Sequence, residues 1–151
     1  MKKIIAALTA VFMIAAQTAV FAGNAEIIID GKKAEISEEM GSVVLKDDRT
    51  FVPVRFVLEN FGYDVSWSSE DKLVLGRNKA GDVFVMQVGS PLLIFKGADG
   101  TDKNEKMDVT PFLNEAEGRT YIPIRFLAET LGYKVGYNDA DKTVTLDKEV
   151  K

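Results

Sequence analysis

Short apolar runs alternate with compact polar stretches along the chain, and the period of each run indicates its conformation. Between Pro53 and Gly62, apolar residues stand at i, i+3, i+4 and i+7, the spacing of one helix face. These residues are Val54, Val57, Leu58 and Phe61. Proline suits the first turn of a helix, and glycine suits the left-handed position that closes one. The pattern therefore predicts a short helix that runs to Phe61.

The period changes to two after this glycine. Apolar and polar residues alternate from Tyr63 to Trp67, which is typical of a half-buried strand. The polar stretch Ser68–Asp71 predicts a tight turn, and Lys72–Leu75 returns as the partner strand. With the β-prone run Thr50–Val52 before the helix, the unit reads strand, helix, strand, turn, strand.

The same unit occurs twice in the chain. Residues 49–75 align with residues 119–145 at a shift of 70, and twelve of the 27 aligned positions are identical. The helix stripe recurs at Ile124, Leu127, Ala128 and Leu131, and Gly132 follows it. A repeat of this kind is one supersecondary unit that cannot bury its apolar face alone.

Segments before each unit also predict strands. Ile27–Ile29 and Lys33–Ile36 flank Asp30-Gly31, a dipeptide typical of two-residue hairpin turns. Val83–Val88 and Leu92–Phe95 form the corresponding run before the second unit. We expect hairpins in both places.

Two polar stretches are expected to be irregular. Gly97–Asn104 predicts a flexible loop, and Arg77–Asp82 predicts the joint between two related halves, about 23–77 and 82–148. The expected fold is α+β, with mainly antiparallel strands and one short helix in each half. The helix stripes should pack against the sheet.

The N-terminus has the three parts of a secretory signal peptide. Lys2 and Lys3 precede the apolar run Ile4–Val20, and Val20-Phe21-Ala22 offers small residues before a cleavage site. Cleavage would separate a 1–22 signal from a 23–151 domain that is secreted, extracellular or associated with the cell wall. The alternative is an uncleaved membrane anchor. No later apolar stretch is long enough to span a membrane.

Composition excludes several classes of function. The chain has 19 Lys+Arg against 23 Asp+Glu, a formal net charge of -4, and this acidic balance argues against nucleic-acid binding. It has no cysteine and no histidine, which removes thiolate nucleophiles, imidazole bases and the usual copper and zinc ligands. We expect no catalytic residues, no metal and no cofactor.

The repeated motif R-T-[FY]-[VI]-P-[VI]-R-F-x-x-E-x-x-G-Y-x-V-x-[WY] resembles the copper amine oxidase N-terminal-like domain, also called the stalk domain. Arg49–Leu75 and Arg119–Leu146 carry the resemblance, which extends more weakly to Val83–Phe95 and Met107–Pro111. It implies a non-catalytic accessory module of secreted and cell-surface proteins in Gram-positive-type bacteria. Amine oxidase chemistry belongs to a separate, larger catalytic domain, so the resemblance implies fold and location without copper activity.

Two sets of residues recur in both copies and are candidates for recognition. Arg55 with Glu59, and Arg125 with Glu129, are spaced i, i+4 on the helices. They fit either structural ion pairs, which we favour, or a site for an anionic or sugar ligand.

Tyr63 with Trp67, and Tyr133 with Tyr137, lie four apart on strands and therefore share a face. They fit either core packing, which we favour, or stacking on the glycan rings of the cell wall.

Carboxylates gather in two turns, and a weak calcium site is conceivable there. They are Asp99, Asp102 and Glu105 in one stretch, and Asp139 and Asp141 in another. We favour the interpretation that these are solvent-exposed turn residues without a metal.

The leading hypothesis for function is a secreted, non-enzymatic module that contacts an unknown protein or cell-wall glycan. The alternatives are a glycan-binding module and, from another class, a small carboxylate-dependent hydrolase.

Overall fold

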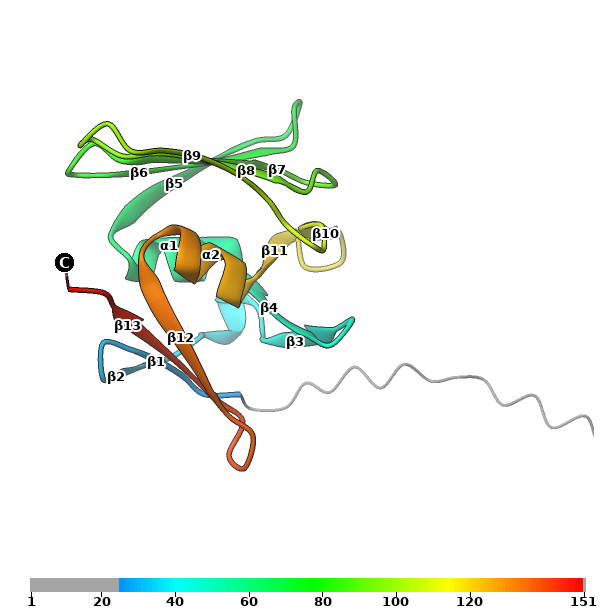
Figure 1. The fold of residues 1–151 in the computed structure, drawn as a ribbon. Helices are drawn as coiled ribbons and strands as arrows, with labels where there is room; N and C mark the ends of the chain where they lie inside the picture. The colour runs from blue at the N-terminus through cyan, green and yellow to red at the C-terminus, as the bar shows by residue number, and fades with distance from the viewer. Residues whose placement is uncertain (1–24, 151) are drawn as a thin grey trace, which may run out of the picture.

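The computed structural model describes residues 25–150, so the expected signal peptide and its cleavage site lie outside the described residues. The fold is α+β: mostly antiparallel strands in three sheets, with two short helices among the described residues (Figure 1). The expected fold class is confirmed. No helix of the described part is long and apolar enough to cross a membrane.

From residue 25 onward, the first half contains six strands, an α-helix and a 3-10 turn. Its elements are β1 (Ile27–Ile29), β2 (Lys32–Ala34), η1 (Glu38–Met40), β3 (Val44–Lys46), β4 (Arg49–Pro53), α1 (Val54–Asn60), β5 (Tyr63–Ser68) and β6 (Leu73–Asn78). The order β4-α1-β5-β6 confirms the predicted unit.

The second half contains seven strands and one helix. Its elements are β7 (Val83–Gln87), β8 (Leu92–Lys96), β9 (Asp102–Lys106), β10 (Phe112–Asn114), β11 (Arg119–Pro123), α2 (Ile124–Thr130), β12 (Tyr133–Asn138) and β13 (Thr143–Lys148). The order β11-α2-β12-β13 repeats that of the first half. Both aligned stretches thus adopt the same local structure.

A glycine in the left-handed conformation closes each helix, as the sequence predicts. Gly62 and Gly132 each have φ of 83°, the left-handed conformation that glycine adopts at low cost. Their N–H groups donate to the carbonyls of Glu59 and Glu129 at 3.0 and 3.1 Å. The helices stop one residue earlier than predicted, so Phe61 follows α1 as its C-cap.

The central sheet, β10-β11-β4-β3, joins the halves through an antiparallel β4–β11 pair. Val52 faces Ile122, while Phe51 faces Pro123 and Pro53 faces Tyr121. A shift of 70 residues maps this register onto itself, so a pseudo-two-fold axis passes between Val52 and Ile122. Both of these side chains are fully buried.

Two hairpins flank this pair and were not predicted from the sequence. The β3–β4 turn consists of Asp47 and Asp48, both at positive φ, as a type I′ turn requires. The β10–β11 turn has four residues, Glu115–Gly118. The second half therefore has two extra residues at this hairpin, which lies outside the 27-residue aligned stretch.

The two outer sheets differ. The five-stranded sheet has the order β5-β6-β7-β8-β9 and is wholly antiparallel. The second outer sheet, here the mixed sheet, has the order β12-β13-β1-β2, with β1 parallel to β13. Since β1 belongs to the first half, the halves interlock. The Asp30-Gly31 hairpin forms as predicted, with both residues at positive φ.

The polar stretch Gly97–Asn104 was predicted to be a loop throughout, and this is wrong in part. Asp102–Asn104 lie in β9, which pairs with β8 along its full length. Its sequence, DKNEK, has no apolar alternation, because β9 is an edge strand with charged side chains on both faces. Between Arg77 and Asp82 the chain makes a tight turn from β6 to β7, closed by a 2.8 Å bond from Asn78 Nδ2 to Asp82 Oδ2.

One contiguous core serves both halves. As predicted, Val54, Val57 and Leu58 are buried on α1. Phe56 is buried as well, off the predicted stripe, because the helix lies between two sheets that cover a wide arc of its surface. Burying one large apolar side chain contributes about 1.5–3 kcal/mol. This chain without cysteine depends on such packing rather than on disulfides.

Candidate binding groove

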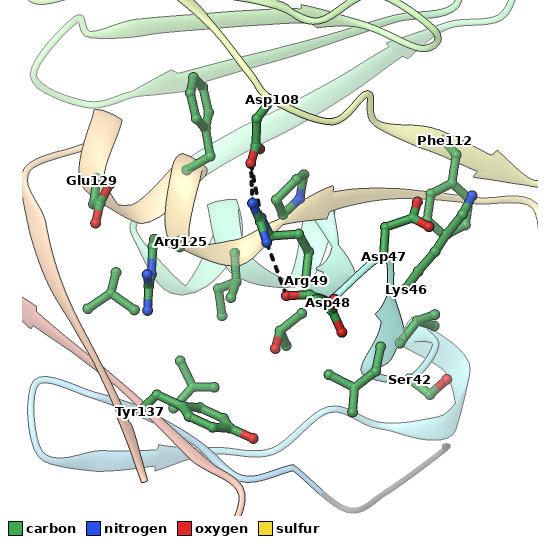
Figure 2. Close-up of a pocket in the computed structure, with 18 of the residues that line it drawn as sticks. Ser42, Lys46, Asp47, Asp48, Arg49, Asp108, Phe112, Arg125, Glu129 and Tyr137 are labelled. Carbon is green, nitrogen blue, oxygen red and sulfur yellow. Dashed lines mark hydrogen bonds and ion pairs between the residues drawn. The ribbon is translucent and has the colours of Figure 1, made fainter. Parts of the chain in front are cut away.

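An open groove of about 1430 Å³ lies between the β3–β4 hairpin, α2 and β12, and we call it the α2 groove (Figure 2). Its wall combines residues from both halves. Its polar and aromatic lining residues include Ser42, Lys46, Asp48, Arg49, Asp108, Phe112, Glu117, Arg125, Phe126, Glu129 and Tyr137. Two of its borders, β3 and β12, are edge strands of their sheets.

Arg49 and Asp108 form an ion pair in the middle of the groove (Figure 2). Arg49 Nε donates to Asp108 Oδ2 at 3.1 Å, and its Nη1 donates to the Asp48 carbonyl at 3.3 Å. The hydrogen bond from Arg49 lowers the pKa of Asp108, and the same contact raises the pKa of Arg49. This charge pair links the start of β4 to the segment before β10.

One wall of the groove is held by stacked rings. Phe112 and Tyr121 stack with centroids 5.2 Å apart, and the Lys46 ammonium lies 4.5 Å above the Phe112 ring. The Tyr121 hydroxyl donates to Glu117 at 2.5 Å and accepts from the Ser42 N–H at 3.3 Å. Burial and the Glu117 carboxylate raise the pKa of Tyr121. These contacts make this wall a fixed surface.

The opposite wall carries three of the predicted candidates. Arg125 and Glu129 stand on α2, and Tyr137 lies across from them on β12 with 47% of its surface exposed (Figure 2). In the described part of the chain, neither the Arg125 side chain nor the Glu129 side chain has an ion-pair or hydrogen-bond partner. The groove thus presents an uncommitted guanidinium, a carboxylate and an aromatic ring.

The first-half candidates lie elsewhere. Arg55 pairs with Glu59 at 3.5 Å on α1, both side chains being exposed. Trp67 is partly exposed on β5, the edge of the five-stranded sheet. None of these three lines the α2 groove.

The two remaining aromatic candidates belong to the core. Tyr63 and Tyr133 are buried, and Phe61 stacks on Tyr133 with centroids 4.1 Å apart. Burial, followed by Asp82 and Tyr133, raises the pKa of Tyr63 to about 12. Burial also raises the pKa of Tyr133, with a smaller contribution from Asp30. Each strand therefore exposes one ring, Trp67 or Tyr137, rather than a strip of two.

The carboxylates singled out as calcium candidates engage nearby donors. Asp102 pairs with Lys96 at 3.6 Å, and Glu105 accepts from the Thr130 hydroxyl at 3.2 Å. In the turns, the carboxylates accept from neighbours in sequence: Asp99 from Thr101 N, Asp139 from Lys142 Nζ and Asp141 from Thr143 N. Within residues 25–150, no three acidic side chains are grouped as a metal site requires.

A family model of the copper amine oxidase N-terminal domain matches residues 11–75 and 28–146. The chain belongs to this family. The two overlapping matches agree with the internal repeat, and the resemblance seen in the sequence is confirmed. The copper amine oxidase N-terminal domain is a non-catalytic, stalk-like accessory domain. Comparisons with curated proteins and with solved structures returned no match.

Copper does not fit the side chains of this copper amine oxidase N-terminal domain. The sequence has no histidine and no cysteine, so it offers neither the imidazole nor the thiolate ligands that copper prefers in proteins. The charged groups of the α2 groove are carboxylates, guanidinium groups and ammonium groups, and hydroxyl and amide groups lie among them. Such groups suit the binding of charged and polar partners.

Sequence reasoning missed the wall of the groove opposite α2 and β12. Its residues Lys46 and Arg49 belong to the β3–β4 hairpin, Phe112 to β10 and Asp108 to the segment before β10. Arg49 recurs as Arg119 in the repeat, which was a usable signal. The three-residue strands β3 and β10 gave no sequence signal, because such strands are too short to show a hydrophobic period.

Proposed function

We propose that this domain is a secreted, non-catalytic interaction module of the bacterial cell envelope or exterior, and that its partner binds in the α2 groove. The observation that carries the proposal is the placement of Arg125 and Tyr137, exposed on the second-half wall, opposite the fixed wall of Phe112 and Arg49. A groove built from both halves and preformed by one ion pair and stacked rings loses little entropy when it binds a partner.

The location outside the cytoplasm rests on residues 1–22 and their signal-peptide pattern. Cells that produce a tagged chain should be separated into medium, wall, membrane and cytoplasm. We expect the mature form, starting at residue 23, in the medium or the wall. A matched chain lacking residues 2–22 should stay in the cytoplasm, and cytoplasmic retention of both chains would overturn this part of the proposal.

The charges in the groove favour binding over catalysis. A hydrolase with two carboxylates needs one of them as a general acid, which requires a raised pKa and a dry site. Asp108 has a lowered pKa, because Arg49 stabilises its charged form. It lies in an open, solvated groove.

A glycan of the cell wall is the second candidate partner, and the pair Tyr137 and Arg125 favours it. The exposed ring of Tyr137 offers a flat face for the apolar side of a sugar. The guanidinium of Arg125 suits the carboxylate of an acidic sugar or peptide.

Matched variants can test both partners. We expect Tyr137→Ala and Arg125→Ala to weaken binding to purified wall material at least tenfold in a pull-down. The equivalent first-half variants, Trp67→Ala and Arg55→Ala, serve as controls and should retain binding. Equal binding by all four variants would show that the groove is not the site.

Fluorescence gives a direct readout, because Trp67 is the single tryptophan and lies outside the groove. The double variant Trp67→Phe, Tyr137→Trp moves the reporter into the groove. Glycan fragments should change its emission while leaving that of the wild type unchanged. A change on adding wall proteins, with none on adding glycan, would assign the groove to a protein partner.

A further inference from the structure

Strand β12 is the edge of the mixed sheet and one border of the α2 groove. Its neighbour β13 bonds β1 through alternate residues. The N–H of Val144 donates to the Glu26 carbonyl at 2.8 Å. The Leu146 carbonyl accepts from the Asp30 N–H at 2.8 Å. In an antiparallel ladder, both main-chain groups of a residue point to one side and successive residues alternate, so the β13 residues next to these bond β12.

The register then assigns the main-chain groups of β12. Gly136 lies opposite Thr145 and exchanges hydrogen bonds with it, so the two neighbours of Gly136 point away from β13. These neighbours are Val135 and Tyr137, and both line the α2 groove. Among residues 25–150, no main-chain bond from outside the sheet reaches them. The edge thus offers two N–H donors and two carbonyl acceptors, with the residues about 6.8 Å apart.

This edge is open to pairing with another chain. Edge strands are usually protected by proline, a bulge or inward-pointing charges. β12 has no proline, pairs with β13 without a bulge, and carries one charged residue, Lys134, on the face opposite the core. In contrast, β9 has charged residues on both faces, and Lys103 reaches inward to the Thr130 carbonyl at 3.0 Å. β12 lacks the protection that β9 has.

The second edge beside the groove, β3, offers fewer free groups. The turn between β3 and β4 has two residues, which makes Lys46 and Arg49, on either side of it, a hydrogen-bonded pair. Alternation then leaves Leu45 as the one residue of β3 that directs its main-chain groups outward. One residue cannot hold an added strand in register, so β12 is the favoured edge.

We propose that the partner in the α2 groove is an extended peptide segment of a protein, which adds to β12 as a further strand. This inference rests on the proposed function, because it names the kind of partner bound at the same site. Strand addition gives affinity through main-chain hydrogen bonds and specificity through alternate side chains. A peptide beside β12 directs every second side chain to the groove face of the sheet.

The charges on α2 define which peptide side chains fit. Arg125 and Glu129 have no ion-pair partner among residues 25–150. They stand one helical turn apart, about 6 Å along the axis, and alternate residues of a strand are about 6.8 Å apart. Figure 2 shows Glu129, Arg125 and Tyr137 following one another along one side of the groove. A peptide with an acidic and a basic residue two positions apart complements this wall.

A random heptapeptide library displayed on phage is the probe for this partner. The wild-type domain should select peptides that carry an acidic and a basic residue two positions apart and bind with a Kd of about 100 µM or tighter. Arg125→Glu should weaken the selected peptide at least tenfold, and replacing the peptide's acidic residue by lysine should restore binding. A library that yields no binder, or binders indifferent to Arg125→Glu, would overturn the inference.

Proline at position 135 tests the main-chain bond. Val135→Pro removes an N–H that points out of the edge and none that bonds β13, and proline is tolerated on the free side of an edge strand. We expect it to bind the selected peptide at least tenfold more weakly than Val135→Ala, which keeps the N–H. The equivalent change on β5, Val65→Pro, should bind like the wild type.

Circular dichroism must show the wild-type fold for each proline variant. If Val135→Pro is unfolded, Tyr137→Pro is compared with Tyr137→Ala instead. Equal binding by the proline variant and its alanine control would contradict strand addition.

Amide hydrogen exchange followed by nuclear magnetic resonance tests the wild type directly. The amides of Val135 and Tyr137 should exchange rapidly in the free domain and at least tenfold more slowly with the selected peptide bound. The equivalent β5 amides, Val65 and Trp67, should not change. If wall material binds through Arg125 and Tyr137 but leaves both β12 amides unprotected, the proposed function stands and strand addition is wrong.

Discussion

Strands β6 and β13 occupy equivalent places in the repeated unit but have different neighbours. β6 pairs with β7, which continues into two more antiparallel strands, whereas β13 pairs with the short parallel strand β1. The turn after β7 reaches the central sheet region, where Gly89 N–H donates to the Pro111 carbonyl at 3.1 Å. The first half is therefore more extensively covered than the second.

The two helices differ in burial in the same way. Phe56 on α1 is 1% exposed, while its repeat equivalent Phe126 on α2 is half-buried and lines the α2 groove. Likewise, the outward residue Leu75 is replaced by Thr145. One local unit thus gives a covered side, where Phe56 is buried, and an open side, where Phe126 lines the α2 groove. The local sequence determines the fold of the repeated unit. The strands that flank it determine which of its surfaces stay exposed and available for binding.

The largest expected effect comes from the two phenylalanines. Phe56→Ala removes a fully buried ring and should lower the free energy of unfolding by about 3–5 kcal/mol. Phe126→Ala should cost about half as much, since its ring already contacts solvent in the groove. Urea denaturation measures both values. Equal losses would show that the two helices are equally buried and would contradict the difference between the two halves.

The buried tyrosines should make the protein sensitive to alkaline pH. Tyr63 keeps its proton in the folded state up to a pKa of about 12, whereas in the unfolded chain it ionises near 10. Its contribution is fully present below pH 10 and is lost as pH rises through 12. The loss is on the order of 1–2 kcal/mol after allowance for solvent screening.

Tyr63→Phe should flatten the fall in stability between pH 10 and 12, as measured by urea denaturation at several pH values. Tyr133→Phe is the matched variant of the other half, and it should flatten the curve in the same direction, because the pKa of Tyr133 is also raised. An unchanged slope in Tyr63→Phe would contradict the assignment.

The helix-closing glycines should respond alike in both halves. Gly62→Ala and Gly132→Ala each place a Cβ at φ of 83°, where no atom lies within 4 Å, so the cost is conformational. We expect a loss of about 1 kcal/mol for each variant in thermal or urea unfolding. A difference well above the experimental error would mean that the helix ends are not equivalent.

Much of the repeated unit was predictable because its signals are local. Proline before the helix, glycine after it and the change of period from 3.6 to 2 all lie within 27 residues. The pairing of Val52 with Ile122 depends on chain segments 70 residues apart, and no local pattern encodes it. The same holds for β1, which crosses to pair with β13.

The candidate site was predicted only in part, for the same reason. Arg125, Glu129 and Tyr137 were named because they recur in the repeat, but recurrence could not tell which copy faces a groove. The opposite wall depends on the three-residue strands β3 and β10 and on Asp108, which has no repeat equivalent in the aligned stretches. β9 was missed because an edge strand with charged faces lacks the apolar alternation of a half-buried strand.

The smallest expected effect separates the two arginines on the helices. Arg55 forms an exposed i, i+4 pair with Glu59, and such a pair contributes about 0.2–0.5 kcal/mol. Arg55→Ala should therefore lower stability slightly, and the effect should shrink at high salt. Arg125 lacks an ion-pair partner among the described residues, so Arg125→Ala should leave the unfolding midpoint nearly unchanged and independent of salt. A stability loss for Arg125→Ala as large as that for Arg55→Ala would mean that the Arg125 guanidinium makes a stabilising contact within the fold. Partner binding would then have to depend on Tyr137 and the opposite wall.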